Sequence, residues 1–173
     1  MKRISCSFDR HAEQILAIFN DAILTSTALY DYQARTMDNM VRWFEAKTAG
    51  NYPVIGYENE AGELMGFASY GPFRNYPANK YTLEHSVYIA KPFRGQGLAT
   101  QLMQDVIAAA TEQNYHTLIG SIDARNNASI QLHDKLGFTH AGTIRHAGFK
   151  FGDWLDLAFY QLILPTPHEP IDG

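Results

Sequence analysis

Apolar residues recur with two different periods along the chain, and one period gives way to the other within residues 83–100. From 83 to 89 the residues alternate as in a β-strand, with one face formed by Leu83, His85, Val87 and Ile89. A turn at 94–97 contains two glycines, and after it the apolar positions follow helical spacing at Leu98, Leu102, Val106 and Ala110. This pattern predicts a strand, a glycine loop and a helix.

The same two periods predict the other elements. Strands are expected at 3–8, 54–57, 64–70, 117–122, 139–145 and 155–164. Helices are expected after Asp9 as far as about Thr25, after Thr36 as far as about Gly50, and from a cap at Asn127 to Gly137. Residues 26–35 and 73–78 follow neither period and are expected to be loops, with 148–154 as the turn between the last two strands.

Composition limits the class of protein. Hydrophobic residues make up 46% of the 173 and charged residues 18%, as in one soluble domain, which we place at 1–164 with a loose tail at 165–173. The net charge of -4 argues against a general nucleic-acid binder. The single cysteine, Cys6, cannot form an internal disulfide, and no segment approaches the roughly 18 apolar residues of a membrane span. A cytoplasmic location is therefore expected.

The glycine loop predicts an anion site, because a helix N-terminus exposes unpaired N–H groups and the positive end of its dipole. Two nucleotide-binding motifs fit poorly. The phosphate loop of nucleoside triphosphatases requires a lysine that does not follow Gly97, and the dinucleotide fingerprint requires a small residue where Thr100 stands.

Residues 94–99, Arg-Gly-Gln-Gly-Leu-Ala, resemble the acyl-coenzyme A loop of the GCN5-related N-acetyltransferase (GNAT) family. The flanking stretches 84–89 and 132–138 resemble the branch that acetylates phosphinothricin and methionine sulfoximine, and the likeness covers nearly the whole chain. The resemblance implies a mixed α/β fold with a central twisted mixed sheet flanked by helices. It also implies acetyl-CoA as co-substrate.

The resemblance implies a donor site as well. The loop backbone would hold the diphosphate, Arg94 would add a charged contact, main-chain N–H groups of 87–89 would hold the acetyl carbonyl, and Asn126 would bind the pantetheine arm. A surface arginine and a capping asparagine are the alternatives for Arg94 and Asn126. The expected donor residues are Val87, Tyr88, Ile89, Arg94, Gly95, Gln96, Gly97, Leu98, Ala99, Thr100 and Asn126.

Two residues are candidates for proton transfer. Glu84 lies on the central strand, where partial desolvation would raise the pKa of its carboxyl group and suit it to act as a base, although a solvent-facing glutamate is the alternative. His133 stands where many family members carry a tyrosine thought to protonate the coenzyme thiolate. A histidine that only packs its helix is the alternative. We interpret His85, on the opposite face from Glu84, as structural.

The acceptor would be an amino-acid-like amine. Arg74 is the candidate for gripping its carboxylate, with Phe73, Tyr76 and Tyr30 as walls of the pocket. The stretch 150–154, with Lys150 and Trp154, resembles the one by which this branch packs a neighbouring subunit against the pocket, and so implies a homodimer. An aromatic hairpin tip within the monomer is the alternative.

These residues predict an N-acetyltransferase in which the α-amino group of a small amino-acid analogue attacks the thioester directly. The resemblance implies phosphinothricin, methionine sulfoximine or methionine sulfone as the acceptor. The alternatives are an acetyltransferase of protein N-termini or polyamines, and a noncatalytic acyl-CoA sensor. The seven histidines show no metal-binding spacing, so no metal is expected.

Overall fold

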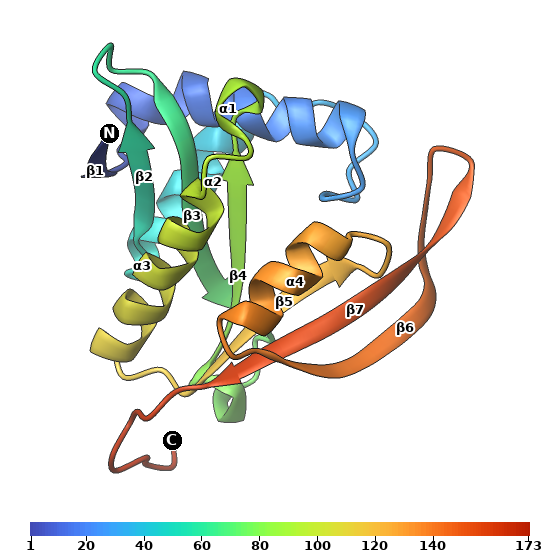
Figure 1. The fold of residues 1–173 in the computed structure, drawn as a ribbon. Coiled ribbons are helices and arrows are strands. Elements are labelled where there is room, and N and C mark those ends of the chain that lie inside the picture. Colours follow the sequence, from blue (N-terminus) through green and yellow to red (C-terminus); the bar gives the residue numbers. More distant parts are fainter. The chain divides into compact units, whose positions relative to one another are not determined.

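The computed structural model describes residues 1–173 and contains two compact units, each discontinuous in sequence (Figure 1). The first unit comprises residues 1–71 and 86–106, and the second comprises 72–85 and 107–173. Strand β4 (Thr82–Ile89) and helix α3 (Leu98–Glu112) each contribute residues to both. The predicted mixed α/β fold is confirmed, with seven strands and four α-helices.

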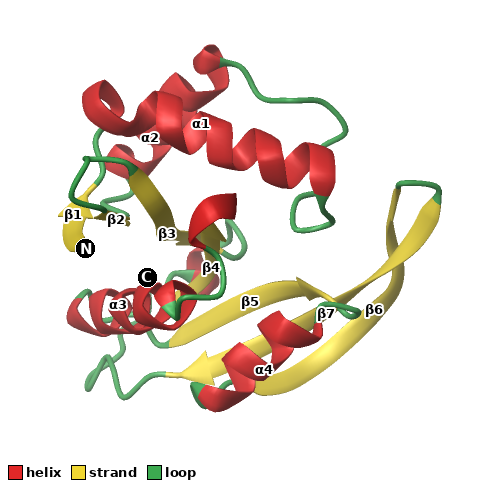
Figure 2. Ribbon diagram, turned by 45° about the horizontal axis from the view of Figure 1, so that its top comes forward, coloured by secondary structure: helices red, strands yellow, loops and turns green.

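The first unit contains β1 (Lys2–Ser5), α1 (Phe8–Thr25), α2 (Met37–Ala49), β2 (Val54–Glu58) and β3 (Leu64–Pro72). Its strands follow the order β1-β2-β3-β4, and the pairs β1–β2 and β2–β3 are antiparallel. Helices α1 and α2 lie on one side of β1–β3 (Figures 1 and 2). Alternate side chains of β2 point to opposite sides of the sheet, and those on the side away from α1 and α2 face α3. Val54 joins the core under α1 and α2, whereas the Tyr57 hydroxyl donates a 2.7 Å bond to Asp105 on α3.

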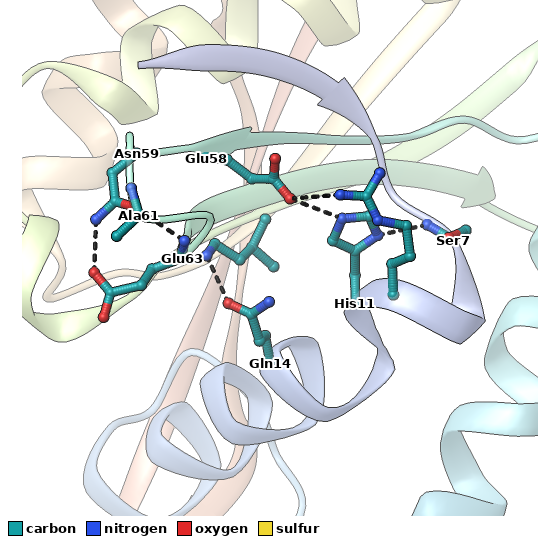
Figure 3. Close-up of polar contacts among 9 residues, drawn as sticks. Ser7, His11, Gln14, Glu58, Asn59, Ala61 and Glu63 are labelled. Carbon is teal, nitrogen blue, oxygen red and sulfur yellow. Dashed lines mark hydrogen bonds and ion pairs between the residues drawn. The ribbon is translucent and has the colours of Figure 1, made fainter.

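The start of α1 departs from the prediction. The strand ends at Ser5 and the helix begins at Phe8, so residues 6–8 are not a strand. The N-cap of the helix is Ser7 and not Asp9. The Ser7 side chain forms no capping hydrogen bond, and the His11 side chain binds the backbone at the start of the helix instead. Its Nδ1 accepts a 2.9 Å hydrogen bond from the Ser7 N–H, and its Nε2 donates to Glu58 at 3.1 Å (Figure 3). In contrast, the predicted cap at Thr36 is confirmed, because Thr36 and Asn39 form a capping box.

The second unit contains β5 (Thr117–Asp123), α4 (Asn127–Lys135), β6 (Thr139–Lys150) and β7 (Asp153–Ile163). Its strands follow the order β4-β5-β7-β6, where β4–β5 is parallel and the other pairs are antiparallel. The cap of α4 is Asn126, one residue before the prediction, and its side chain accepts a bond from the Ser129 N–H. A short 3-10 helix, η1 (Pro77–Asn79), occupies part of the predicted loop 73–78.

Strands β6 and β7 run further than predicted. They form a long two-stranded ribbon that continues beyond β5 (Figure 1), and the turn between them is only Phe151 and Gly152. Both turn residues have positive φ, as in the tight hairpin turns whose twist matches that of the strands. The predicted turn at 148–154 is therefore wrong, because its outer residues pair across the ribbon.

The segment after Leu164, expected to be loose, is held at Thr166. The Thr166 hydroxyl donates to the Tyr115 carbonyl at 2.6 Å, and the Thr166 carbonyl lies 2.6 Å from Nδ1 of His116. None of the helices is both long and apolar enough to cross a lipid bilayer.

Candidate active site

The glycine loop of the first unit follows η2 (Lys91–Phe93) and leads into α3. Gly95 and Gly97 have φ of +77° and +80°, a conformation that disfavours any residue with a Cβ. A Cβ at either position would meet no atom within 4 Å, so the glycines are not needed to make room for the rest of the chain. Leu98, which is 3% exposed, fixes the start of the helix in the core, while residues 94–97 remain exposed.

This loop has the properties of an anion site. The backbone is open, the N-terminus of α3 follows at once, and the first turn of α3 contains no acidic side chain to occupy that end of the dipole. The predicted binding of a diphosphate by residues 95–100 stays a prediction.

Arg94 is anchored within the first unit. Its Nε donates to the Ile89 carbonyl at 3.1 Å and its Nη2 donates to Asp21 of α1 at 2.9 Å. The side chain is half exposed, so it can still face a ligand, but its charge is already paired. Sequence reasoning missed Asp21, which lies 73 positions away and gives no local signal.

The predicted carbonyl-binding residues 87–89 lie on β4 beside β3. Ala90 donates its N–H to Met65, and a Cβ on Gly66 would lie 2.8 Å from the Tyr88 carbonyl, so glycine permits this close approach. The Tyr88 ring packs edge-on against Phe19 at 5.1 Å. Tyr30 lies in the loop after α1 and is 38% exposed.

Glu84 belongs to the second unit. It pairs with Ile119 across β4 and β5, and Ser121, two residues further along β5 on the same face, donates a hydrogen bond to its carboxylate. The side chain is half-buried, and this burial raises the pKa of the Glu84 carboxyl group, while the Ser121 bond lowers it to a smaller extent. The predicted direction of the shift is confirmed.

Aromatic side chains extend the face that carries Glu84. Phe159 on β7 stands directly opposite Ser121 in the antiparallel register, so the two side chains point the same way. The Phe159 ring contacts Phe73, with ring centroids 6.1 Å apart. Phe73 therefore lies beside the face of the candidate base, and its role as a wall of the acceptor pocket stays a prediction. Ser121 and Phe159 were missed, because only strand register brings them there.

Arg74 follows Phe73 and is exposed. Its guanidinium lies 4.9 Å from the centre of the Tyr76 ring, an arrangement that orients the group without neutralising it. Two of the predicted acceptor residues are thus in contact with each other.

His85 and His133 form a buried pair on the opposite face of the sheet from Glu84. Their rings stack at 5.1 Å, and their Nε2 atoms are 3.1 Å apart. A Cβ on Gly120 would come within 2.9 Å of both Nε2 atoms, so the pair fits only over a glycine. Burial lowers the pKa of both imidazoles, to about 3 for His85, where the neighbouring His133 adds to the effect.

Hydrogen bonding fixes how protons are arranged in this pair. Nδ1 of His133 lies 2.7 Å from the Ser129 carbonyl and must carry a proton to donate there, so Nε2 of the neutral ring accepts from Nε2 of His85. Nδ1 of His85 is then a buried acceptor without a partner. To protonate a thiolate, His133 would have to give up one of its two bonds. The geometry thus favours the packing interpretation of His133 over the acid.

The remaining predicted residues lie at the edges of the second unit. Asn126 is exposed and caps α4, which leaves its amide nitrogen for a ligand. Lys150 is 4% exposed at the end of β6, with Nζ 5.0 Å from the centre of the Phe151 ring. Trp154 is 56% exposed and stacks on His146. No three histidine, cysteine, aspartate or glutamate side chains form a group suited to a metal ion.

Comparison with known proteins identifies the family. The model of the acetyltransferase (GNAT) family matches residues 15–138. An L-methionine sulfoximine/L-methionine sulfone acetyltransferase from Pseudomonas paraeruginosa is 43% identical over 90% of this chain and 91% of its own. The chain belongs to the GNAT family. The predictions of the family and of an acetyltransferase are confirmed.

Solved structures agree with this GNAT assignment. A protein from Acinetobacter baylyi ADP1 is 57% identical, with a TM-score of 0.99 over 99% of this chain and 96% of that one. A ribosomal-protein-alanine N-acetyltransferase from Brucella melitensis is 38% identical, with a TM-score of 0.92 over 95% and 100% of the two chains. A phosphinothricin acetyltransferase from Sinorhizobium meliloti in complex with AcCoA is 29% identical, with a TM-score of 0.90 over 94% and 88%.

In this GNAT chain, Ser121 should control the acidity of Glu84. Replacing Ser121 with Ala removes a hydrogen bond to the charged carboxylate, so the pKa of Glu84 should rise further. Titration of a ¹³C-labelled carboxyl group by NMR measures this directly. Thr117→Ala, on the same face of β5, is the control and should leave the Glu84 titration in place. An unchanged pKa of Glu84 in Ser121→Ala would show that the hydrogen bond from Ser121 does not form.

Proposed function

We propose that this chain transfers an acetyl group from acetyl-CoA to the α-amino group of a small amino-acid analogue such as methionine sulfoximine, methionine sulfone or phosphinothricin. The observation that carries the proposal is the half-buried Glu84 carboxylate on β4, the strand that leads through η2 into the open glycine loop. The similarity to the Pseudomonas paraeruginosa enzyme over 90% of the chain supports this choice of acceptors.

Donor binding is assigned to the first unit. The diphosphate of acetyl-CoA would accept hydrogen bonds from the N–H groups of residues 95–100, where the backbone is open. Main-chain N–H groups of 87–89 would receive the acetyl carbonyl and stabilise the oxyanion that develops on it. The AcCoA complex of the Sinorhizobium meliloti enzyme supports this co-substrate.

Acceptor binding is assigned to the second unit. Arg74, held over Tyr76, would pair with the substrate carboxylate through its planar guanidinium, and Phe73 would contact the side chain of the acceptor. An acceptor with a carboxylate fits this arrangement better than a polyamine, because Arg74 repels a cation.

The reaction then needs two proton acceptors. Glu84 takes one proton from the α-ammonium group, directly or through a water molecule, and the neutral amine attacks the thioester carbonyl. The C–N bond forms, the C–S bond breaks, and the thiolate of coenzyme A takes the second proton that the nitrogen loses and leaves as the thiol. Because burial raises the pKa of Glu84, the carboxylate is a stronger base than an exposed glutamate.

A panel of acceptors tests the function. We expect release of coenzyme A thiol to be fastest with methionine sulfoximine, methionine sulfone or phosphinothricin, and at least about tenfold slower with their decarboxylated amines, which lose the pairing with Arg74. An alanine-terminated peptide tests the activity named for the Brucella melitensis structure. Faster turnover of that peptide or of spermidine would overturn the proposed acceptor class.

Replacing Glu84 with Gln tests the mechanism. Glutamine keeps the size of the side chain but cannot take a proton, so kcat should fall roughly 10²- to 10⁴-fold. The affinity for acetyl-CoA, measured by calorimetry, should change little, since the donor site is assigned to other residues. An unchanged kcat would exclude Glu84 as the base.

We also propose that two copies of the chain associate through the β6–β7 ribbon. Large exposed apolar side chains gather there, namely Ile144, Phe149, Phe151 and Trp154. Sedimentation velocity should show a dimer that Trp154→Glu dissociates, while Ile171→Glu, at an even more exposed position on the C-terminal segment, leaves it intact. A wild-type monomer at micromolar concentration would contradict the association.

A further inference from the structure

The side chain of Arg94, at the start of the glycine loop, binds two other segments of the first unit. Its Nε donates to the carbonyl of Ile89, the last residue of β4, at 3.1 Å, and its Nη2 donates to Oδ2 of Asp21 on α1 at 2.9 Å. The bond to Ile89 closes the backbone of 89–94, which includes η2, into a ring. Arg94 therefore ties the end of the strand, the helix α1 and the loop to one another.

Helix α1 also contacts this segment at its other end. Phe19, two residues before Asp21, is 2% exposed and packs edge-on against the ring of Tyr88 at 5.1 Å. The segment 88–94 is thus held by α1 at Tyr88 and again at Arg94. Its position in the first unit depends on two neighbouring residues of one helix.

Asp21 is an unexpected neighbour for an anion site. The first turn of α3 contains no acidic side chain, yet the Asp21 carboxylate lies 2.9 Å from the guanidinium that begins the loop. A carboxylate there repels a diphosphate and offsets the charge of Arg94. If Arg94 bound the diphosphate, Asp21 would compete with the phosphate groups for it. The same carboxylate is useful if the task of Arg94 is to hold the loop.

We propose that Asp21 is a positioning residue of the donor site: it fixes Arg94, and Arg94 in turn fixes the loop instead of binding the diphosphate. The guanidinium is planar with its donors in a rigid fork, so two acceptors on different segments fix both its place and its orientation. The diphosphate is then bound by backbone N–H groups of residues 95–100. This assignment rests on the proposed function for the place of the diphosphate.

Fixing the loop in advance lowers the cost of binding. Glycine loses more conformational freedom on ordering than any other residue, and the loop contains two, Gly95 and Gly97. A ligand that had to order this turn would lose part of its binding free energy in doing so. The pair of Asp21 and Arg94 is partly exposed to water, so its contribution is modest, and we expect its loss to weaken acetyl-CoA binding about three- to fivefold.

Calorimetric titration with acetyl-CoA tests the role of Asp21. Asp21→Ala should bind acetyl-CoA about three- to fivefold more weakly than the wild type, with little change in kcat at saturating acetyl-CoA. The double variant with Arg94→Ala should bind no more weakly than Arg94→Ala alone, because both changes remove the same contact. A phosphate-binding Arg94 predicts the opposite sign, since Asp21→Ala would release its guanidinium. Unchanged or tighter binding by Asp21→Ala therefore overturns the proposal.

Replacing Arg94 with Lys tests the role of the arginine. Lysine keeps the positive charge and binds phosphate as a point charge, but it lacks the planar fork that reaches Ile89 and Asp21 together. Arg94→Lys should therefore bind acetyl-CoA about as weakly as Arg94→Ala. Affinity close to that of the wild type in Arg94→Lys would show that the charge alone matters and would overturn the proposal.

An ion pair elsewhere in the first unit supplies the control. Asp31 and Arg35 are also 2.9 Å apart, and Asp31→Ala should leave the affinity for acetyl-CoA unchanged. A loss equal to that in Asp21→Ala would overturn a specific role for Asp21.

Acetyl-pantetheine, which lacks the diphosphate, separates this inference from the proposed function. The wild type should bind acetyl-CoA at least about tenfold more tightly than acetyl-pantetheine. Equal affinities would overturn the donor assignment and the role of Asp21 with it. Tighter binding of acetyl-CoA by the wild type, together with undiminished binding by Asp21→Ala, would overturn the role of Asp21 alone.

Discussion

Neighbouring residues of a β-strand point to opposite faces, and in β4 this constraint separates Glu84 from His85. On β5 the same alternation places Ser121 on the face of Glu84 and Gly120 on the face of His85. Helix α4 closes the histidine face with His133, whereas the glutamate keeps part of its contact with water. Because of this alternation, one of the two neighbouring side chains keeps contact with water, through which it could exchange protons with a substrate, and the other is enclosed in the core.

Burial disfavours the charged form of each of these groups, so it raises the pKa of an acid and lowers the pKa of a base. It raises the pKa of Glu84, and it lowers the pKa of His85, His133 and Lys47. The consequences differ because water access differs. Glu84 and Lys47 are half-buried and keep some contact with water, whereas the two histidines have their nitrogens engaged in hydrogen bonds or enclosed in the core. A perturbed pKa identifies a reactive group here only together with its exposure.

Signals confined to a few neighbouring residues could be read from the sequence. Thr36 capped its helix as predicted, and the glycine loop followed by helical periodicity located the start of α3 correctly. The cap of α1 was misplaced because His11, one turn into the helix, performs that task. Ser121, Phe159 and Asp21 could not be found, since strand register and tertiary packing bring them to their partners. The sequence offered proton roles for both Glu84 and His133, and burial and hydrogen bonding are what distinguish their surroundings.

Two groups of glycines in this chain differ in the reason why a side chain is disfavoured. Gly50, Gly66 and Gly120 leave no room for a Cβ, since other atoms of the protein lie within 3 Å of where it would stand. Gly95 and Gly97 face open space, yet adopt a backbone conformation that other residues avoid. Packing therefore explains the first kind and cannot explain the second. At Gly95 and Gly97 the turn before α3 is thus kept free of side chains, next to a helix N-terminus without acidic residues, and these are the conditions under which a phosphate group can approach backbone N–H groups closely.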